Sequence, residues 1–466
     1  MDTLVQQKNR NHKALRPPLA KGLPVLGNAL EFSDMDAFLR KKYLELGPIF
    51  RIRALNMEFV VLAGREANLF FSKEATKYFT SAQALQDFNA ELGVSRSIGS
   101  MDGPDHAKYR NASKLGYSLA MLEQQLDQAV AIARREVASW STIKPQPVFY
   151  LMQRIIIQQI GLLLTNYSPY EYLDDIILFS RILIATKTTR LRPEFMTYLP
   201  AYRRAKARVF ELLRKVIAAH TTEPSGDRLK AAAASEHRHP DLIDDLLQFM
   251  KQEPEILPTQ EDRILAVMNP FLAGVDTAAS TAAFLLYALL KHPEILEQAT
   301  FEANALFANG MPTPDSLRRL DVLPRATLEA LRMYPIAPAV FRSVTVPFEF
   351  AGYRIEAGQR ALIATTVPHQ LPEFYPNPFQ FDIDRYKKGR EEHHRQPGVF
   401  APFGLDPHMC LGMNFAQALI PLNIATILQA VRLEMVPANY QLRIDLIPTP
   451  SPDSKFQIRV AQRFEL

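Results

Sequence analysis

Helical patterns run through most of the chain, from about Gly64 to residue 335, and they constrain its fold more than any other feature. Apolar residues recur there at intervals of three and four, as on the buried face of an amphipathic helix. The ranges with this pattern include Met121–Trp140, Pro147–Thr165, Tyr202–His220, Pro240–Lys251 and Thr259–Lys291. We therefore predict a mainly α fold with small β-sheets.

Strand patterns flank this helical region. Runs of β-branched and aromatic residues at Ile49–Leu55 and Glu58–Ala63 predict a hairpin around Asn56. Further strands are expected at Ser343–Ile355, Gln359–Thr366 and Leu442–Phe464, with a helix from Cys410 to about Arg432. Because no repeat or composition break marks a boundary, we predict a polar tail at 1–16 and one domain at 17–466. A polar connection is expected at Thr222–Arg238.

Composition limits the possible partners and surroundings. The net charge of +5 is mild, and no Lys/Arg cluster is interleaved with aromatic residues, which favours acidic protein partners over nucleic acid. A single cysteine excludes an internal disulfide and fits a reducing cytoplasm. The most apolar stretches, Ile155–Leu164 and Ala282–Leu290, are shorter than the roughly 20 residues that a membrane helix needs. We expect buried core helices there and no integral membrane span.

The only cysteine lies in the segment Phe403–Gly412, which reads FGLDPHMCLG. An aromatic–glycine turn delivers Cys410 to the start of a predicted helix, where free N–H groups and the helix dipole favour a thiolate. A thiolate is a known axial ligand of haem iron, and Gly412 would let the backbone lie close to a flat macrocycle. The alternative is a buried structural cysteine, which is a common fate of a lone cysteine.

Together with motifs elsewhere, this segment resembles the haem-binding signature of the cytochrome P-450 superfamily. Phe403, Cys410 and Gly412 are in register with it, and His408 stands where the family has a basic residue on a haem propionate. Glu329-Ala330-Leu331-Arg332 matches the family's Glu-x-x-Arg pair on a helix, and Arg385 matches the arginine that completes this structural triad. The resemblance spans about residue 17 to the C-terminus.

The segment Ala273-Gly274-Val275-Asp276-Thr277 matches the oxygen-activation segment of this family. The resemblance implies that Gly274 opens a groove beside the iron, while Asp276 and Thr277 are the catalytic pair. A hydroxyl that holds ordered water, backed by a carboxylate that reaches solvent, can relay protons. The alternative is a helix kink that Thr277 stabilises by bonding back to a carbonyl.

A set of basic residues matches the family's propionate contacts. His106 and Arg110 are four apart and share a helix face, and Arg342 lies on the first strand after the Glu-x-x-Arg helix. Individually, each of them is more often an ordinary surface charge, but as a set they favour propionate binding. The run Glu391–His394 suggests zinc at first sight, but adjacent histidines on a charged loop seldom converge on one metal, so we expect a solvated loop.

Three positions depart from the family pattern. Asp406 replaces the glycine usual in the cysteine loop; aspartate tolerates positive φ better than most residues, so some strain is expected. Ala278 stands where a second hydroxyl is common, which leaves the relay dependent on Thr277 alone. Tyr386 replaces a phenylalanine, a change of little consequence.

The resemblance implies a triangular, mainly α cytochrome P-450 fold with one haem b (iron protoporphyrin IX) between the long central helix and the cysteine loop. The implied reaction is insertion of one oxygen atom from O2 into a small apolar substrate of lipid, terpenoid or sterol type. The substrate walls would come from Tyr78–Met101, Ile176–Thr186, the Ala273 turn, Pro338–Phe341 and the last hairpin.

Electrons would come from a separate donor, a ferredoxin, flavodoxin or diflavin reductase, because no fused flavin domain is visible. We expect a monomer with a basic patch at Lys108, Lys387, Lys388 and Arg390 that receives an acidic partner. Two other classes remain open. One is a peroxide-using or peroxide-isomerising haem-thiolate enzyme, and the other is a non-catalytic haem carrier or sensor.

Overall fold

The computed structural model describes residues 16–221 and 240–465. The predicted connection Thr222–Arg238 and all but the last residue of the predicted tail 1–16 lie outside these ranges. The helices are α1 (Met35–Leu46), α2 (Arg65–Tyr78), α3 (Gln86–Leu92), α4 (Gly103–Ser113), α5 (Leu119–Glu123), α6 (Leu126–Ala138), α7 (Val148–Thr165), α8 (Leu173–Leu183), α9 (Pro200–Thr221), α11 (Leu242–Gln252), α12 (Gln260–Lys291), α13 (Pro293–Phe307), α14 (Pro314–Arg318), α15 (Val322–Met333), α16 (Glu392–Arg395) and α17 (Met413–Ala430).

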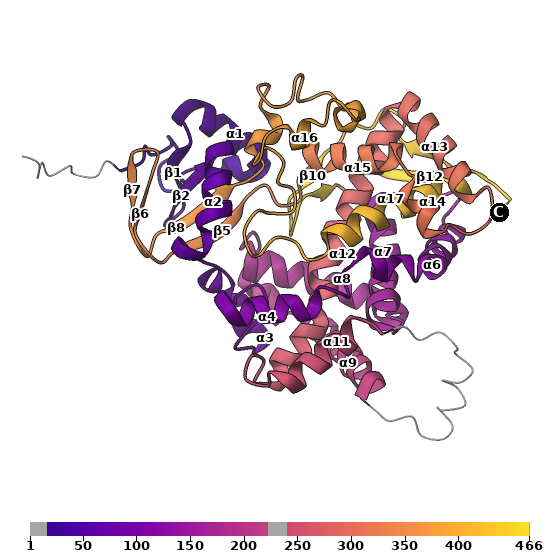
Figure 1. Cartoon of the computed structure of the whole chain (residues 1–466), viewed down its shortest axis with the longest axis horizontal. Coiled ribbons are helices and arrows are strands. Elements are labelled where there is room, and N and C mark those ends of the chain that lie inside the picture. Colours follow the sequence, from indigo (N-terminus) through magenta and orange to yellow (C-terminus); the bar gives the residue numbers. More distant parts are fainter. Residues whose placement is uncertain (1–15, 222–239, 466) are drawn as a thin grey trace, which may run out of the picture.

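The strands form small sheets at the margins of the helical body (Figure 1). The largest sheet has the order β1-β2-β8-β5-β3, in which β2 and β8 pair in parallel and the other neighbours are antiparallel. The strands are β1 (Ile49–Ala54), β2 (Met57–Ala63), β3 (Phe79–Thr80), β4 (Gln146–Pro147), β5 (Val340–Val344), β6 (Phe348–Phe350), β7 (Tyr353–Ile355), β8 (Arg360–Ala364), β9 (Val431–Val436), β10 (Ile444–Asp445), β11 (Ser451–Pro452) and β12 (Gln457–Arg463).

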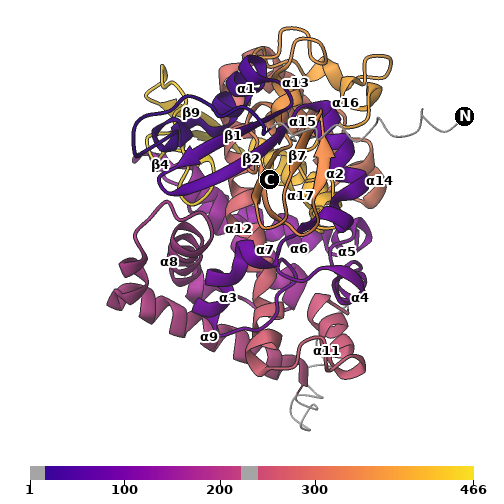
Figure 2. The same ribbon diagram turned by 90° about the vertical axis from the view of Figure 1, so that its left-hand side faces the viewer.

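The predicted fold class is confirmed, since 56% of the chain is helical and the sheets are small. The predicted hairpin is β1–β2, and its first pair, Ile49 with Leu62, continues in register to Ala54 with Met57. Figure 2, turned by 90°, shows this hairpin at the upper part of the molecule, with α8, α9 and α11 below it.

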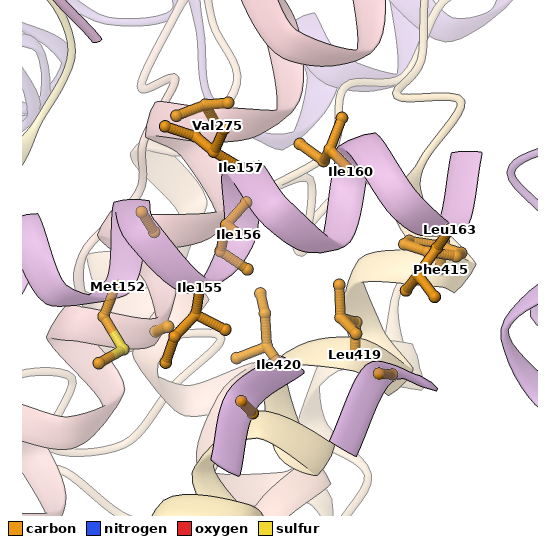
Figure 3. Packing of buried hydrophobic residues seen from close by; sticks show 14 of the residues in the cluster. Met152, Ile155, Ile156, Ile157, Ile160, Leu163, Val275, Phe415, Leu419 and Ile420 are labelled. Atoms are coloured by element: carbon orange, nitrogen blue, oxygen red, sulfur yellow. The ribbon is translucent and has the colours of Figure 1, made fainter. Parts of the chain in front are cut away.

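One large apolar cluster holds the helical body together. Ile155 and Ile156 of α7 point toward Leu419 and Ile420 of α17, whereas Ile157 lies beside α12 (Figure 3). Burial of such side chains contributes about 1.5–3 kcal/mol each. Both predicted core helices are in this cluster. The helices α7 and α12 are long and apolar enough to cross a membrane, but 83% and 78% of their apolar windows are buried inside the fold, as in core helices.

The long helix α12 is fixed at its N-terminus by a reciprocal cap. The hydroxyl of Thr259 accepts the N–H of Asp262 at 3.1 Å, and the Asp262 carboxylate accepts the N–H of Thr259 at 3.1 Å. The same carboxylate accepts hydrogen bonds from the backbone of Ser95 and Arg96, at 2.8 and 3.0 Å. The cap therefore joins the start of α12 to the loop before α4.

Candidate active site

The cysteine loop is closed by two backbone hydrogen bonds. The N–H of Cys410 donates to the carbonyl of Phe403 at 2.8 Å, and the N–H of Met409 donates to the carbonyl of Asp406 at 2.8 Å. Gly404 takes the left-handed conformation that the turn requires, with φ +85°. Among the described residues of this loop, Asp406 does not have positive φ, so the strain expected at that position is absent.

The cysteine does not begin the following helix, contrary to the prediction. Helix α17 begins at Met413, and Gly412 occupies its N-cap position. Burial raises the pKa of the Cys410 thiol, while the N–H of Gly412 and the charge of Arg110 act to lower it. Cys410 is nevertheless exposed as a residue. Thiolate stabilisation therefore rests on one nearby N–H and one cation instead of a full helix terminus.

The central turn of α12 carries accessible residues in an otherwise buried helix. Ala273 and Thr277, four apart and so on one face, are exposed, whereas Val275 and Asp276 beside them are buried. The Thr277 hydroxyl donates to the carbonyl of Ala273 at 2.7 Å. This is the back-bond of the alternative interpretation, so Thr277 serves the helix backbone and at the same time faces open space.

Asp276 points away from Thr277 and into the protein. Its carboxylate accepts hydrogen bonds from Gln153 at 2.6 Å and from Arg181 at 3.1 Å. Burial raises the pKa of Asp276, although Arg181 and Gln153 act to lower it. The prediction that this carboxylate is open to solvent is therefore wrong, because Asp276 is 4% exposed. Its partner Arg181 lies 4.0 Å from the half-exposed Asp445 at the surface.

Gly274 also has a different role from the one expected. A Cβ at this position would lie 2.9 Å from Cδ1 of Ile160, on α7. Figure 3 shows Ile160 on the α7 turn that follows Ile157, which lies beside Val275 of α12. The glycine therefore permits close packing of α12 against α7, and the predicted groove beside the iron has no support at this residue.

The predicted propionate residues gather at one edge of the site. The rings of His106 and His408 stack with centroids 4.1 Å apart, and Arg110 donates to the carbonyl of Met409 at 2.7 Å. The fourth residue, Arg342 of β5, bonds to Asp406 in the cysteine loop. The structure thus brings all four basic residues to the same loop, although they come from α4, β5 and the loop itself.

The electrostatics of this edge are divided among several groups. Burial and the neighbouring His408 lower the pKa of His106 to about 4, so its ring is neutral at pH 7. Burial acts to raise the pKa of Asp102, but hydrogen bonds from His408 and Thr80 outweigh it and hold that pKa at about 2. His408 lies 2.9 Å from this carboxylate. Asp102, which precedes α4, was not anticipated from the sequence.

These residues fit a haem. Nε2 of His106 is buried, and nothing among the described residues bonds to it, which leaves it available to a propionate. Cys410 in the loop and Ala273 and Thr277 on the core helix are all exposed. The space beside Gly412 is open among the described residues, since a Cβ there would meet nothing closer than 3.8 Å.

The predicted triad of Glu329, Arg332 and Arg385 is confirmed as a buried charge cluster. Arg332 donates to both oxygens of Glu329 at 2.8 Å, and Arg385 donates to the same carboxylate at 3.2 Å. Tyr386, whose replacement of phenylalanine was expected to have little consequence, donates a hydrogen bond from its hydroxyl to Glu329 at 3.0 Å. The tyrosine therefore adds a hydrogen bond that phenylalanine could not make.

A lone exposed cysteine in a closed loop bordered by basic residues is the arrangement of a haem-thiolate site. A sequence model of the cytochrome P450 family matches residues 17–457, and the chain belongs to that family. It is accordingly a cytochrome P450 monooxygenase that binds haem b.

Similar proteins agree with this assignment. The chain is 24% identical to a sterol 14alpha-demethylase of Mycolicibacterium vanbaalenii over 446 residues, which cover 91% of this chain and 93% of that protein. It is 24% identical to the lanosterol 14-alpha demethylase of Bos taurus over 456 residues, 91% and 85% of the two chains. The crystal structure of the cytochrome P450DA heme domain has the same fold, with a TM-score of 0.80, 24% identity and coverage of 97% and 98%.

Proposed function

We propose that this enzyme inserts one oxygen atom from O2 into an apolar substrate of lipid, terpenoid or sterol type, with electrons from a separate donor. The observation that carries the proposal is the turn of α12 in which an accessible hydroxyl, Thr277, adjoins a buried and paired carboxylate, Asp276. Enzymes that consume peroxide need no proton delivery of this kind. An acid and an alcohol in adjacent positions therefore support the use of O2.

The haem, when bound, supplies the redox chemistry that activates O2. In this proposal the thiolate of Cys410 would bind the iron, and Phe403 and Gly412 would shape the loop that presents the sulfur. The propionates would be held by the basic residues already described, His106, Arg110, Arg342 and His408. The neutral His106 contributes a hydrogen bond, and Arg110 contributes charge.

Thr277 and Asp276 both take part in the proposed delivery of protons. Because the Thr277 hydroxyl hydrogen is directed at Ala273, its oxygen is free to accept a hydrogen bond from water in the open space. Asp276 is separated from solvent by Arg181, whose Nη2 donates to the carbonyl of Ile447 at 2.6 Å. We propose that the Asp276 carboxylate leaves its pair with Arg181, takes up a proton from water near the surface at Asp445, and turns to deliver it to water at Thr277.

The apolar substrate is supported by the side chains at the site and by the relatives. Ala273 offers only a methyl group to the open space. Such lining binds ligands with few polar groups. Two relatives matched over about nine tenths of this chain are named sterol or lanosterol demethylases, which favours a rigid polycyclic substrate.

The predicted basic patch for the electron donor needs revision. Lys108 pairs with Glu253 at 2.9 Å, Lys387 pairs with Asp384 at 2.9 Å, and Arg390 pairs with Asp382 and Glu392. Local carboxylates therefore compensate three of its four charges. We propose instead that the donor docks where the cysteine loop reaches the surface, at the exposed Met409 and Leu115, with Lys114 at its edge.

Substitution of Thr277 tests the proposal. Thr277→Ala should fold and bind haem, but with NAD(P)H and a ferredoxin or flavodoxin system it should release peroxide and lose about 100-fold or more of its product per electron pair. Thr281→Ala is the matched control, because Thr281 makes the same back-bond, to the carbonyl of Thr277 at 2.9 Å, but is buried. Equal product yield in the two variants would refute the relay and support the kink interpretation. Turnover of the wild type with peroxide alone, and none with the NAD(P)H system, would favour the peroxide-using class.

A further inference from the structure

The cysteine loop carries an internal ion pair that involves one of the propionate residues. Oδ2 of Asp406 accepts from Nη2 of Arg342 at 2.5 Å and from Nε at 3.2 Å. The two side chains are 5% and 10% exposed, so water screens the pair poorly. Asp406 stands where the cysteine loop of the family usually has glycine, which has no side chain to make this bond.

Three donors hold the Asp406 carboxylate in place. Besides the two from Arg342, the N–H of His408 donates to Oδ1 at 3.1 Å. The pair also joins elements that are 64 residues apart, the sheet strand β5 and the cysteine loop. The carboxylate is therefore held in one geometry next to the haem site and does not swing freely in solvent.

Most N–H groups of the Arg342 guanidinium already donate hydrogen bonds within the protein. Its Nη1 donates to the carbonyl of Phe341 at 2.8 Å, and the ring of Phe71 lies 5.6 Å from its guanidinium carbon. A guanidinium has five N–H groups, so two remain for a propionate. Arg342 can thus still form a hydrogen bond to the haem, but its positive charge is already balanced.

The other basic residues do not restore the missing charge. His106 is neutral at pH 7, and His408 lies against the ionised Asp102. Among the residues that the structure describes, neither His106 nor Arg110 has a carboxylate within ion-pair distance, and of these two only Arg110 is charged. Two propionates would therefore meet one uncompensated cation.

We propose that Asp406 is a positioning residue that holds Arg342 in the cysteine loop and, by cancelling its charge, lowers the reduction potential of the bound haem. A negative charge fixed beside the haem edge disfavours the added electron, because burial weakens the screening between the two. The same pair leaves Arg342 oriented to donate a hydrogen bond to a propionate, although its charge is compensated by Asp406. This inference rests on haem binding at the proposed residues.

The test measures the Fe(III)/Fe(II) midpoint potential of haem-loaded variants by dye equilibration, without substrate or turnover. Asp406→Asn keeps the size of the side chain and removes its charge. At the wild-type midpoint it should raise the ratio of reduced to oxidised protein by about tenfold, which equals about 59 mV for one electron. Asp315→Asn is the control, because it removes the same charge from an exposed ion pair with Arg318 on α14, and it should change the ratio by less than about twofold.

The directions in which two further variants shift the midpoint potential distinguish an electrostatic effect of Asp406 from a general disturbance of the haem site. Arg342→Gln should shift the potential downward, because it leaves Asp406 unpaired, and the double variant should return close to wild type, because it removes a neutral pair. Shifts of all three in one direction, or Asp406→Asn no different from the control, would overturn the proposal. If Asp406→Asn fails to hold haem, Asp406→Gly takes its place. Loss of haem from both variants would show that Asp406 supports the structure of the haem site and does not set the reduction potential. The carbon monoxide spectrum of the wild type checks haem-thiolate binding first, so failure of the proposed function is recognised separately.

Discussion

Replacement of Glu329 by alanine should destabilise the protein more than almost any other single change on α15. Its carboxylate is completely buried and accepts hydrogen bonds from Arg332, Arg385, Tyr386 and the N–H of Asp382, at 2.8–3.2 Å. Burial acts to lower the pKa of Arg332, but the bonded carboxylate outweighs it and raises that pKa. Without Glu329, Arg332 would keep one hydrogen-bond acceptor among the described residues, the carbonyl of His369 at 2.7 Å, and the ring of Tyr375, whose centroid lies 5.1 Å from its guanidinium carbon.

The magnitude follows from this geometry. Breaking a buried charge pair by removing one partner costs about 3–5 kcal/mol, and at about 1.4 kcal/mol per factor of ten the unfolding equilibrium shifts by roughly two to four orders of magnitude. Arg385 retains a second carboxylate, Glu392, at 2.9 Å, so we expect the lower part of this range. A loss of about 3 kcal/mol is a large fraction of the stability of an ordinary domain.

Urea unfolding at neutral pH, followed by circular dichroism, measures this loss. Glu434→Ala is the control, because Glu434 forms its ion pair with Arg459 at 2.9 Å on the surface, where both side chains are about half exposed. The control should lose about 1 kcal/mol or less. If Glu329→Ala also lost less than about 1 kcal/mol, the cluster would not stabilise the fold and this reasoning would be wrong.

Two other predictions concern titratable groups. Asp276→Asn should slow oxygen consumption more than it diverts electrons to peroxide, because the carboxylate feeds the relay from the surface; normal oxygen consumption measured with an electrode would argue against that path. Burial and the charge of Arg332 lower the pKa of His369 to about 3, and its Nε2 accepts the N–H of Ala401 at 2.9 Å. The folded chain therefore binds fewer protons than the unfolded chain below about pH 6.5, and stability should fall as the pH drops through this window toward about 3. His369→Gln should show a smaller drop in urea midpoint across the same window, and an equal drop in both proteins would count against His369 as the cause.

Local patterns made the main elements and one cluster predictable. Glu329 and Arg332 are three residues apart on a helix, so their pairing follows from helix geometry, and the periodicity of α7 and α12 showed which helices are buried. The lone Cys410 could be assigned because a single candidate ligand leaves no competing choice.

Contacts between distant segments were not predictable in the same way. Arg181 and Asp276 are 95 residues apart, and Asp406 and Arg342 are 64 apart, so neither pair has a local signal. The aspartate in the cysteine loop was expected to carry strain, whereas its actual role depends on a strand that the loop meets only in the folded chain. Gly274 was misjudged for the same reason, because its neighbour Ile160 comes from another helix.

The carbon monoxide spectrum of the reduced protein tests the central claim, that Cys410 is the thiolate ligand of the haem, most directly. The wild type should absorb at the long wavelength typical of thiolate ligation. Cys410→His should still bind haem but lose both this band and monooxygenase turnover, because the chain has no other cysteine to replace the ligand. A variant that retained the thiolate band would contradict the account.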